Sequence, residues 1–170
     1  MRGGRRLVFE NSYKIRVSSR AIVIEGDHLL LTEFGDGQYY NFTGGGIEEG
    51  ETAKQAVIRE VLEESGLTVE VGELVFSLEY EPASSEYSYG KDHHISFFFR
   101  CYVDKSAPAQ APSNPDCDPD DATITSTVKW VPIAELKNIP MVPAIAEPLL
   151  RYIESGMFSP SFWEESEQRK

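Results

Sequence analysis

Three glutamates and one arginine are the residues of this 170-residue chain whose types and spacing favour chemistry: Glu60, Glu63, Glu64 and Arg59. On a helix, spacings of three and four residues bring side chains to one face, so the three carboxylates are expected to converge. Like charges at this spacing repel by about 0.2–0.5 kcal/mol, and a divalent cation with oxygen ligands would relieve that repulsion. We therefore predict a cation site rather than a solvated acidic face, with Arg59 holding a neighbouring carboxylate as a bidentate partner.

A glycine triplet, residues 44–46, comes shortly before these glutamates. Because glycine has no side chain, the backbone there can approach a ligand closely and offer it a carbonyl or an amide. A helix is predicted over Thr52 to Ser65, with Ala53 and Ala56 leaving open space on the carboxylate side. The opposite, mostly apolar arc is expected to face the core and holds Val57, Ile58, Val61, Leu62 and Ser65.

The stretch that contains these features is similar to the Nudix box, written Gly-x5-Glu-x7-Arg-Glu-U-x-Glu-Glu-x-Gly-U, where U is a bulky aliphatic residue. Every specified position is matched without a gap, by Gly45, Glu51, Arg59, Glu60, Val61, Glu63, Glu64, Gly66 and Leu67. One departure from the common pattern is Thr43, since many members have proline immediately before the glycines.

The resemblance implies an enzyme that hydrolyses a nucleoside diphosphate linked to another moiety, with the help of Mg²⁺ or Mn²⁺. Glu60 and Glu64 would be metal ligands, and Gly45 would offer its backbone carbonyl to the metal. Glu63 would be a further ligand or the base that activates water. The substrate would be a small nucleotide.

The resemblance also assigns supporting roles. Arg59 would orient a glutamate, and Glu51 would steady the junction between loop and helix. The catalytic residues expected from the box are therefore Glu63, Arg59 and Glu60.

Candidate substrate-binding residues lie outside the box. Arg16 and Arg20 are in phase on one face of a predicted strand, where they are either paired surface charges or contacts for a substrate phosphate. Glu79 and Glu81 end another predicted strand on one face, and either could assist catalysis.

The net charge of −12 and a pI near 4.7 argue against a protein that binds polymeric nucleic acid or an anionic membrane. The same charge would repel a free diphosphate, so a divalent cation is expected to bridge substrate and protein. The two cysteines show no pairing or zinc-like spacing, and no apolar run suits a signal peptide or a membrane span. A reduced, cytoplasmic setting is the expectation.

The remaining pattern predicts strands separated by turns and two substantial helices. The expected elements are a hairpin over 14–34, strands over 38–43, 68–80 with a bend at Gly72, 92–103 and 123–131, a short helix over 132–136, and an amphipathic helix ending near Glu154. These elements predict an α/β sandwich of the Nudix type, with a mixed β-sheet between helices, formed as a single domain by residues 1–170.

Two loops and the C-terminal segment carry further expectations. The loop over 81–91 could select the substrate, and Pro82 resembles a mark of members that act on ADP-ribose; the loop over 104–122 is expected to be solvated charge or a lid. His93 and His94 should point apart on a strand and act as hydrogen-bonded structural residues rather than share a metal. The C-terminal aromatic residues are expected to dock on the body of the protein or on a second copy in a homodimer: Phe158, Phe162 and Trp163.

The sequence leaves three functions open. Within the enzyme class, nucleoside diphosphate conjugates such as ADP-ribose compete with nucleoside triphosphates, including oxidised ones. The third is a non-catalytic Nudix module that senses a nucleotide; because such modules often lose box glutamates and this chain retains them, an enzyme is the main expectation.

Overall fold

The computed structural model describes residues 14–82, 92–113 and 123–164. The strands are β1 (Ile15–Glu25), β2 (His28–Phe34), β3 (Tyr39–Phe42), β4 (Gly44–Gly46), β5 (Val69–Tyr80), β6 (His93–Val103), β7 (Ser126–Pro132) and β8 (Phe162–Glu164). The helices are α1 (Ala53–Ser65), the 3-10 helix η1 (Ile133–Glu135) and α2 (Ala146–Ser155).

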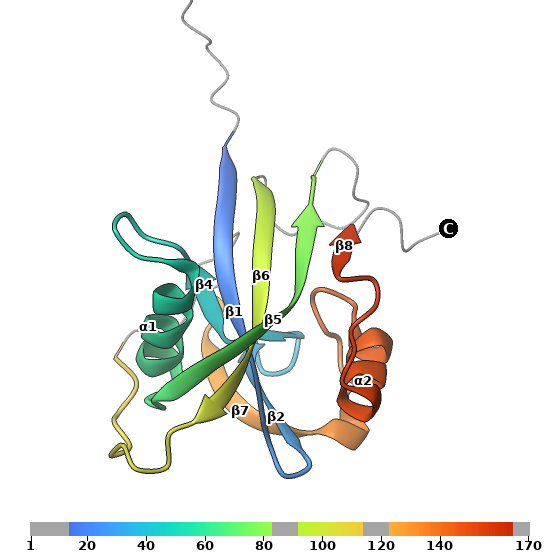
Figure 1. The fold of residues 1–170 in the computed structure, drawn as a ribbon. Helices are drawn as coiled ribbons and strands as arrows, with labels where there is room; N and C mark the ends of the chain where they lie inside the picture. Colours follow the sequence, from blue (N-terminus) through green and yellow to red (C-terminus); the bar gives the residue numbers. More distant parts are fainter. Residues whose placement is uncertain (1–13, 83–91, 114–122, 165–170) are drawn as a thin grey trace, which may run out of the picture.

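The strands form one eight-stranded mixed sheet that lies between α1 and α2 (Figure 1). Its main path runs β3-β2-β1-β6-β5-β8, while β4 pairs with β1 and β7 pairs with β2. The pairs β1–β6 and β5–β8 are parallel, and the other pairs are antiparallel. The predicted α/β sandwich with a mixed sheet between helices is confirmed.

Alternation along β1 creates two cores, because successive side chains of a strand point to opposite faces. Ala21 and Val23 pack in a cluster with Val57 and Val61 of α1. Ile22 packs in the other cluster, which includes side chains of α2. The strand that carries Arg16 and Arg20 is thus buried on both sides along its second half.

Local sequence signals fix both ends of α1. The Thr52 side chain accepts a hydrogen bond from the backbone N–H of Gln55, while the Gln55 side chain accepts one from the backbone N–H of Thr52. This capping box satisfies donors that the helix itself leaves without partners. Gly66 ends the helix in the left-handed conformation with φ 73°. The glutamates of α1 are therefore held on a helix with defined start and end.

The structure differs from the predicted elements at several boundaries. The strand expected over 38–43 is β3, which spans 39–42, and the glycine triplet after it forms the short strand β4 rather than a bend. The predicted strand over 123–131 begins only at Ser126, and the short helix after it is a single 3-10 turn. The register of β5 against β6 shifts on either side of Leu74, close to the bend expected at Gly72. Of the two loops expected over 81–91 and 104–122, residues 83–91 and 114–122 lie outside the described residues.

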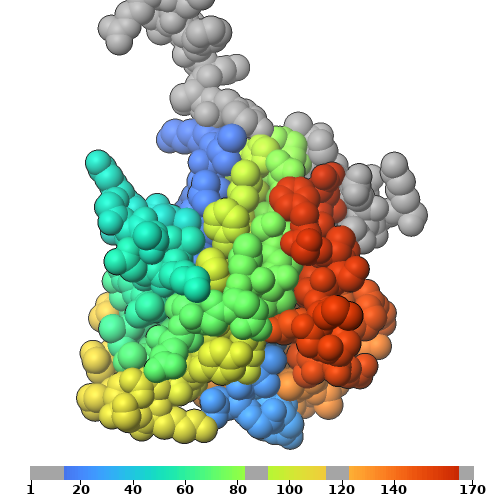
Figure 2. Space-filling model, in the orientation of Figure 1, coloured from blue at the N-terminus to red at the C-terminus, as the bar shows by residue number. Residues whose placement is uncertain are grey.

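The C-terminal segment docks on the body of the protein. Phe158 and Trp163 are buried in the core cluster next to α2, whereas Phe162 is 44% exposed. Strand β8 extends the sheet beside β5, and Figure 2 shows this end of the chain packed along the neighbouring strand. No helix among the described residues has the length and apolar character needed to cross a bilayer.

Candidate functional site

The glycine strand β4 lies directly against a glutamate of α1. Gly44, Gly45 and Gly46 pair with residues 18–20 of β1. A Cβ built on Gly45 would lie 2.5 Å from Glu60 Oε1, so any side chain there would displace the Glu60 carboxylate. The absence of a side chain at Gly45 therefore brings a backbone segment and a carboxylate together.

Arg59 connects the helix to the segment before it. Its guanidinium donates to both carboxylate oxygens of Glu51, at 3.1 Å and 2.7 Å, and to the backbone carbonyl of Gly46 at 3.0 Å. The Arg59 hydrogen bonds hold the pKa of Glu51 below its usual value. This bidentate pair fixes the junction between β4 and α1.

The same guanidinium also reaches two of the three candidate metal ligands. Arg59 Nη1 donates to Glu60 Oε1 at 2.8 Å and to Glu63 Oε2 at 3.2 Å. Burial nevertheless raises the pKa of Glu60 above its usual value, against the lowering effect of Arg59. Glu60 is thus a partly desolvated carboxylate for which a second cation would be favourable.

Glu64 points to a different environment from Glu60 and Glu63. It is only 4% exposed, and its Oε2 accepts a hydrogen bond of 3.1 Å from the hydroxyl of Thr32 on β2. The Thr32 hydroxyl also lies 3.3 Å from that of Thr43, the residue that stands where many Nudix members have proline. A polar contact with the sheet therefore orients Glu64.

The Glu64 contact also explains an error in the predicted helix face. Ile58, expected in the core, is 37% exposed, whereas Ala56, expected beside open space, is fully buried. The helix turns its Ala56–Glu64 side toward the sheet, because Thr32 gives the buried carboxylate a donor. Apolar periodicity alone could not reveal that donor.

The residues present fit a hard divalent cation in their chemistry. The donors are carboxylate oxygens of Glu60, Glu63 and Glu64 and the backbone of Gly45, which are the ligand types that Mg²⁺ and Mn²⁺ prefer. Within the described ranges, however, no three His, Cys, Asp or Glu side chains are close enough together to hold a metal. The expected convergence of all three carboxylates is not seen, because Glu60 and Glu63 face Arg59 while Glu64 faces Thr32.

Arg20 contacts the glycine segment from β1. Its Nη1 donates to the backbone carbonyl of Phe42 at 3.0 Å and to that of Gly44. Its charge also lowers the pKa of Glu60, although less than Arg59 does. Arg16 is exposed and pairs in register with His94 of β6.

A small cavity, which we call the sheet pocket, lies beside Arg20. Its volume is about 20 Å³, and its lining residues are Arg20, Asn41, Leu78, Tyr80, His94, Ser96, Phe98, Val142 and Pro143. Burial and the charge of Arg16 lower the pKa of His94 to about 4, so this imidazole is neutral near pH 7. A cavity of this volume has room for about one water molecule.

Sequence reasoning did not place Asn41 and His94 beside Arg20, where they line the sheet pocket. His94 was expected to be structural, and no local pattern marks Asn41. The signal that could have found His94 is its phase on β6, because it shares a face with Ser96 and Phe98.

Glu79 and Glu81 form a separate group around His93. His93 Nε2 lies 2.8 Å from Glu79 Oε1, and His93 Nδ1 lies 2.9 Å from Glu81 Oε2. The prediction that His93 is a hydrogen-bonded residue and points away from His94 is confirmed, since His94 lines the sheet pocket.

Known proteins resemble this chain in sequence and in fold. The 8-oxo-dGTP diphosphatase of Escherichia coli (strain K12) is 36% identical over 90 residues, which are 51% of this chain and 64% of that protein. The chain thus aligns with less than two thirds of that relative. A NUDIX hydrolase from Nitrosomonas europaea superposes with a TM-score of 0.64 at 22% identity, over 86% of this chain and 93% of that chain.

A structure described as an ADP-ribose pyrophosphatase from Streptococcus suis superposes with a TM-score of 0.56 at 21% identity, over 88% of this chain and 96% of that chain. At such identities the two structures show a shared fold. The NUDIX domain family itself matches residues 14–153. Since this match covers most of the chain, and the box residues lie on the helix and glycine strand described above, the chain belongs to the NUDIX family.

Proposed function

We propose that this protein is a Mg²⁺- or Mn²⁺-dependent hydrolase that cleaves the phosphoanhydride bond of a nucleoside diphosphate linked to another moiety. The observation that carries this proposal is the contact between the Gly45 backbone and the Glu60 carboxylate, within a complete Nudix box. That contact sets hard oxygen donors beside a backbone segment that a substrate could approach.

The residues that would hold the cation are Glu60, Glu64 and the backbone carbonyl of Gly45, with Glu63 as a further ligand. When bound, the cation neutralises charge on the diphosphate and lowers the pKa of a bound water. Glu60 and Glu63 would have to exchange part of their contact with Arg59 for the cation.

Side chains of the protein would accept the proton and position the substrate. Glu63 would accept the proton of the attacking water, while the hydrogen bonds of Arg59 keep Glu60 and Glu51 in place. Arg20 would contact a substrate phosphate beside the glycine strand, and Arg16 would contribute positive charge at the outer end of the same face. Glu79 and Glu81 are bonded to His93, so they are proposed to shape the substrate site rather than to transfer the proton.

A second candidate substrate class is nucleoside triphosphates, including oxidised ones. The relative with 36% identity is named an 8-oxo-dGTP diphosphatase, which favours this class. The structural neighbour named an ADP-ribose pyrophosphatase favours the diphosphate conjugates. Both reactions use the same glutamates, and they differ in the group that leaves.

The experiment is hydrolysis of ADP-ribose and of 8-oxo-dGTP by the purified protein with Mg²⁺. Cleavage of ADP-ribose yields AMP and ribose 5-phosphate, which chromatography separates from the monophosphate and diphosphate ion released by a triphosphate. Glu64→Gln and Glu60→Gln are each expected to lower kcat by about 100-fold or more, since each removes a carboxylate ligand of the cation that would stabilise the negative charge developing on the phosphate.

The matched control is Glu70→Gln, which neutralises an exposed glutamate of β5. It should keep wild-type activity, and circular dichroism should show all three variants folded. Full activity of Glu64→Gln at saturating Mg²⁺ would refute the proposed metal site. Failure of the wild-type protein to cleave either substrate would instead count against hydrolysis of both classes.

A further inference from the structure

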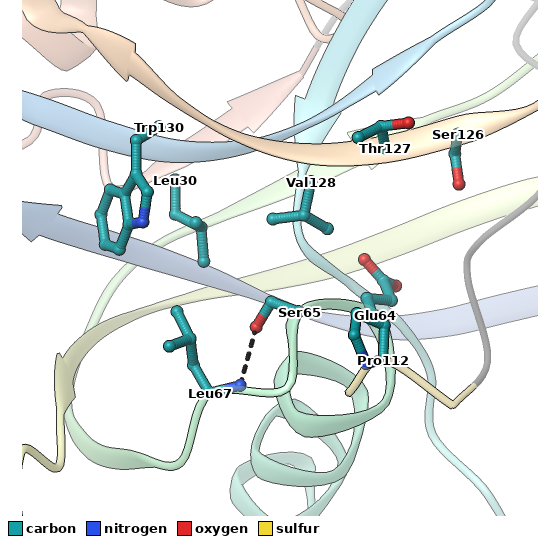
Figure 3. A pocket seen from close by; sticks show the side chains of 9 residues that line it. All are labelled: Leu30, Glu64, Ser65, Leu67, Pro112, Ser126, Thr127, Val128 and Trp130. Atoms are coloured by element: carbon teal, nitrogen blue, oxygen red, sulfur yellow. Dashed lines mark hydrogen bonds between the residues drawn. The ribbon is translucent and has the colours of Figure 1, made fainter. Parts of the chain in front are cut away.

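A second and larger cavity lies beside the C-terminal end of α1, between that end and strands β2 and β7 (Figure 3). Its volume is about 270 Å³, and we call it the helix pocket. Its lining residues are Leu30, Glu64, Ser65, Leu67, Pro112, Ser126, Thr127, Val128 and Trp130. It shares no lining residue with the sheet pocket.

The pocket wall presents an aromatic ring and apolar side chains. Ser126, Val128 and Trp130 lie on one face of β7, because alternate residues of a strand point the same way. The Trp130 side chain is 39% exposed, and Figure 3 shows it at one end of the cavity, across from Leu67. An indole left partly exposed in a concave, mostly apolar site can gain free energy by covering a second ring.

Glu64 connects this cavity to the candidate metal site. In Figure 3 its carboxylate points from α1 toward β7, at the other end of the pocket from Trp130. If Glu64 holds the cation as proposed above, a diphosphate bound there lies at the mouth of the helix pocket. The helix pocket, at about 270 Å³, has room for one of the two groups joined to a diphosphate, whereas the sheet pocket, at about 20 Å³, has room for about one water molecule.

We propose that the helix pocket binds the moiety joined to the nucleoside diphosphate, and that this moiety is a hydroxylated ring such as a pentose phosphate, stacked on Trp130. This inference rests on the proposed function. A sugar ring has an apolar face of C–H groups that suits an indole, and hydroxyls that Ser126 can bond at the wall.

Trp130 provides a direct binding signal, because the chain has two tryptophans and Trp163 is buried in the core. The first experiment titrates wild-type protein with ribose 5-phosphate in Mg²⁺ and follows tryptophan emission. We expect a saturable change that Trp130→Phe abolishes, and a smaller or absent response to AMP. A response to AMP alone, or a response to ribose 5-phosphate that persists in Trp130→Phe, would overturn the assignment.

The second experiment compares ADP-ribose with 8-oxo-dGTP as substrates of Trp130→Ala. The ratio of kcat/KM for ADP-ribose to that for 8-oxo-dGTP should fall by about two- to tenfold. This is the change expected when one aromatic contact to the substrate is lost. Trp130→Phe should restore most of the ratio. Tyr102→Ala is the matched control, since Tyr102 is a 47% exposed aromatic residue on β6 that does not line the pocket, and it should leave the ratio unchanged.

The two experiments separate this inference from the proposed function. An unchanged ratio in Trp130→Ala, in a wild-type enzyme that cleaves ADP-ribose, contradicts the helix pocket assignment and leaves the hydrolase intact. A wild-type protein that cleaves neither substrate contradicts the hydrolase, and the emission titration then decides whether the pocket binds a sugar phosphate.

Discussion

The role of Arg59 follows from the hydrogen-bond partners that lie around its guanidinium group. Arg59 binds Glu51, Glu60, Glu63 and the Gly46 carbonyl, so one guanidinium orders both the segment before α1 and two glutamates on it. A lysine at this position could not form the bidentate pair with Glu51. Arg59 is therefore best described as the residue that positions Glu60.

His94 makes the stability of the protein depend on pH. Its pKa is lowered to about 4, whereas an unfolded chain protonates a histidine near its ordinary pKa of about 6.5. Below about 6.5 the unfolded state binds the proton and the folded state does not, so acidification favours unfolding until the pH reaches about 4. The wild-type free energy of unfolding should fall by about 1 kcal/mol per pH unit more steeply than that of His94→Gln in this window.

The measurement is urea unfolding of both proteins at several values of pH across that window. Carboxylates titrate in both proteins, and their contribution cancels in the difference. Charged neighbours, namely Arg16, Arg20 and Asp92, also remain in the variant. Parallel stability curves for the two proteins would show that His94 is protonated at its ordinary pKa in the folded state.

At the scale of elements, the site depends on how closely β4 and α1 approach. The backbone of Gly45 lies against the Glu60 carboxylate, while the space around Gly46 is open, with no heavy atom within 4 Å of a Cβ built there. The capping box at Thr52 and the Arg59–Glu51 pair hold the helix at this separation. The arrangement of the site therefore depends on the absence of a side chain at Gly45 as well as on the presence of the Glu60 carboxylate.

Gly45→Ala tests this close approach. The added methyl must displace the Glu60 carboxylate, and a shift of about 1 Å in an active site can cost about 100-fold in rate. We expect a loss of kcat of that order with little change in Tm, because Gly45 has a φ outside the left-handed region. Gly46→Ala is the matched control and should keep activity within about threefold. Equal activity of the two variants would argue against the close contact.

In the whole molecule, the sheet separates two hydrophobic cores, which pack against different segments of the chain. The core next to α1 supports the glutamates, while the core next to α2 also receives the C-terminal aromatic residues. Phe158 stacks on Phe76 with ring centroids 4.0 Å apart, and Trp163 meets Phe158 edge-on at 6.1 Å. The C-terminal segment therefore completes the fold of its own chain.

Trp163→Ala is expected to lower the free energy of unfolding by about 3–5 kcal/mol, since it removes a large side chain that is 7% exposed. The neighbouring Phe162→Ala removes a ring that is 44% exposed and should cost less than about 1 kcal/mol. Urea unfolding at several protein concentrations measures both. If Trp163 docked on a second copy instead, the effect would depend on concentration.

Residue types and spacing alone predicted the helix that carries the glutamates and the sandwich with a mixed sheet between helices. These features follow from local rules: Thr52 and Gly66 are favourable cap residues, and strands such as β6 show alternating or continuous apolar runs. The Nudix box residues could also be placed on that helix and before it, because spacing along a helix fixes which side chains share a face.

The direction in which each carboxylate points depends on contacts between separate strands and α1. Glu64 turns toward Thr32, Glu79 and Glu81 bind His93, and His94 joins Asn41 at the sheet pocket. Each of these contacts joins residues that are distant in the sequence, and its free energy depends on a donor or an acceptor that another strand brings close. The periodicity of side chains along one element does not indicate which residues of other elements lie close to it. These partners could therefore be identified only from the three-dimensional packing of the strands and α1.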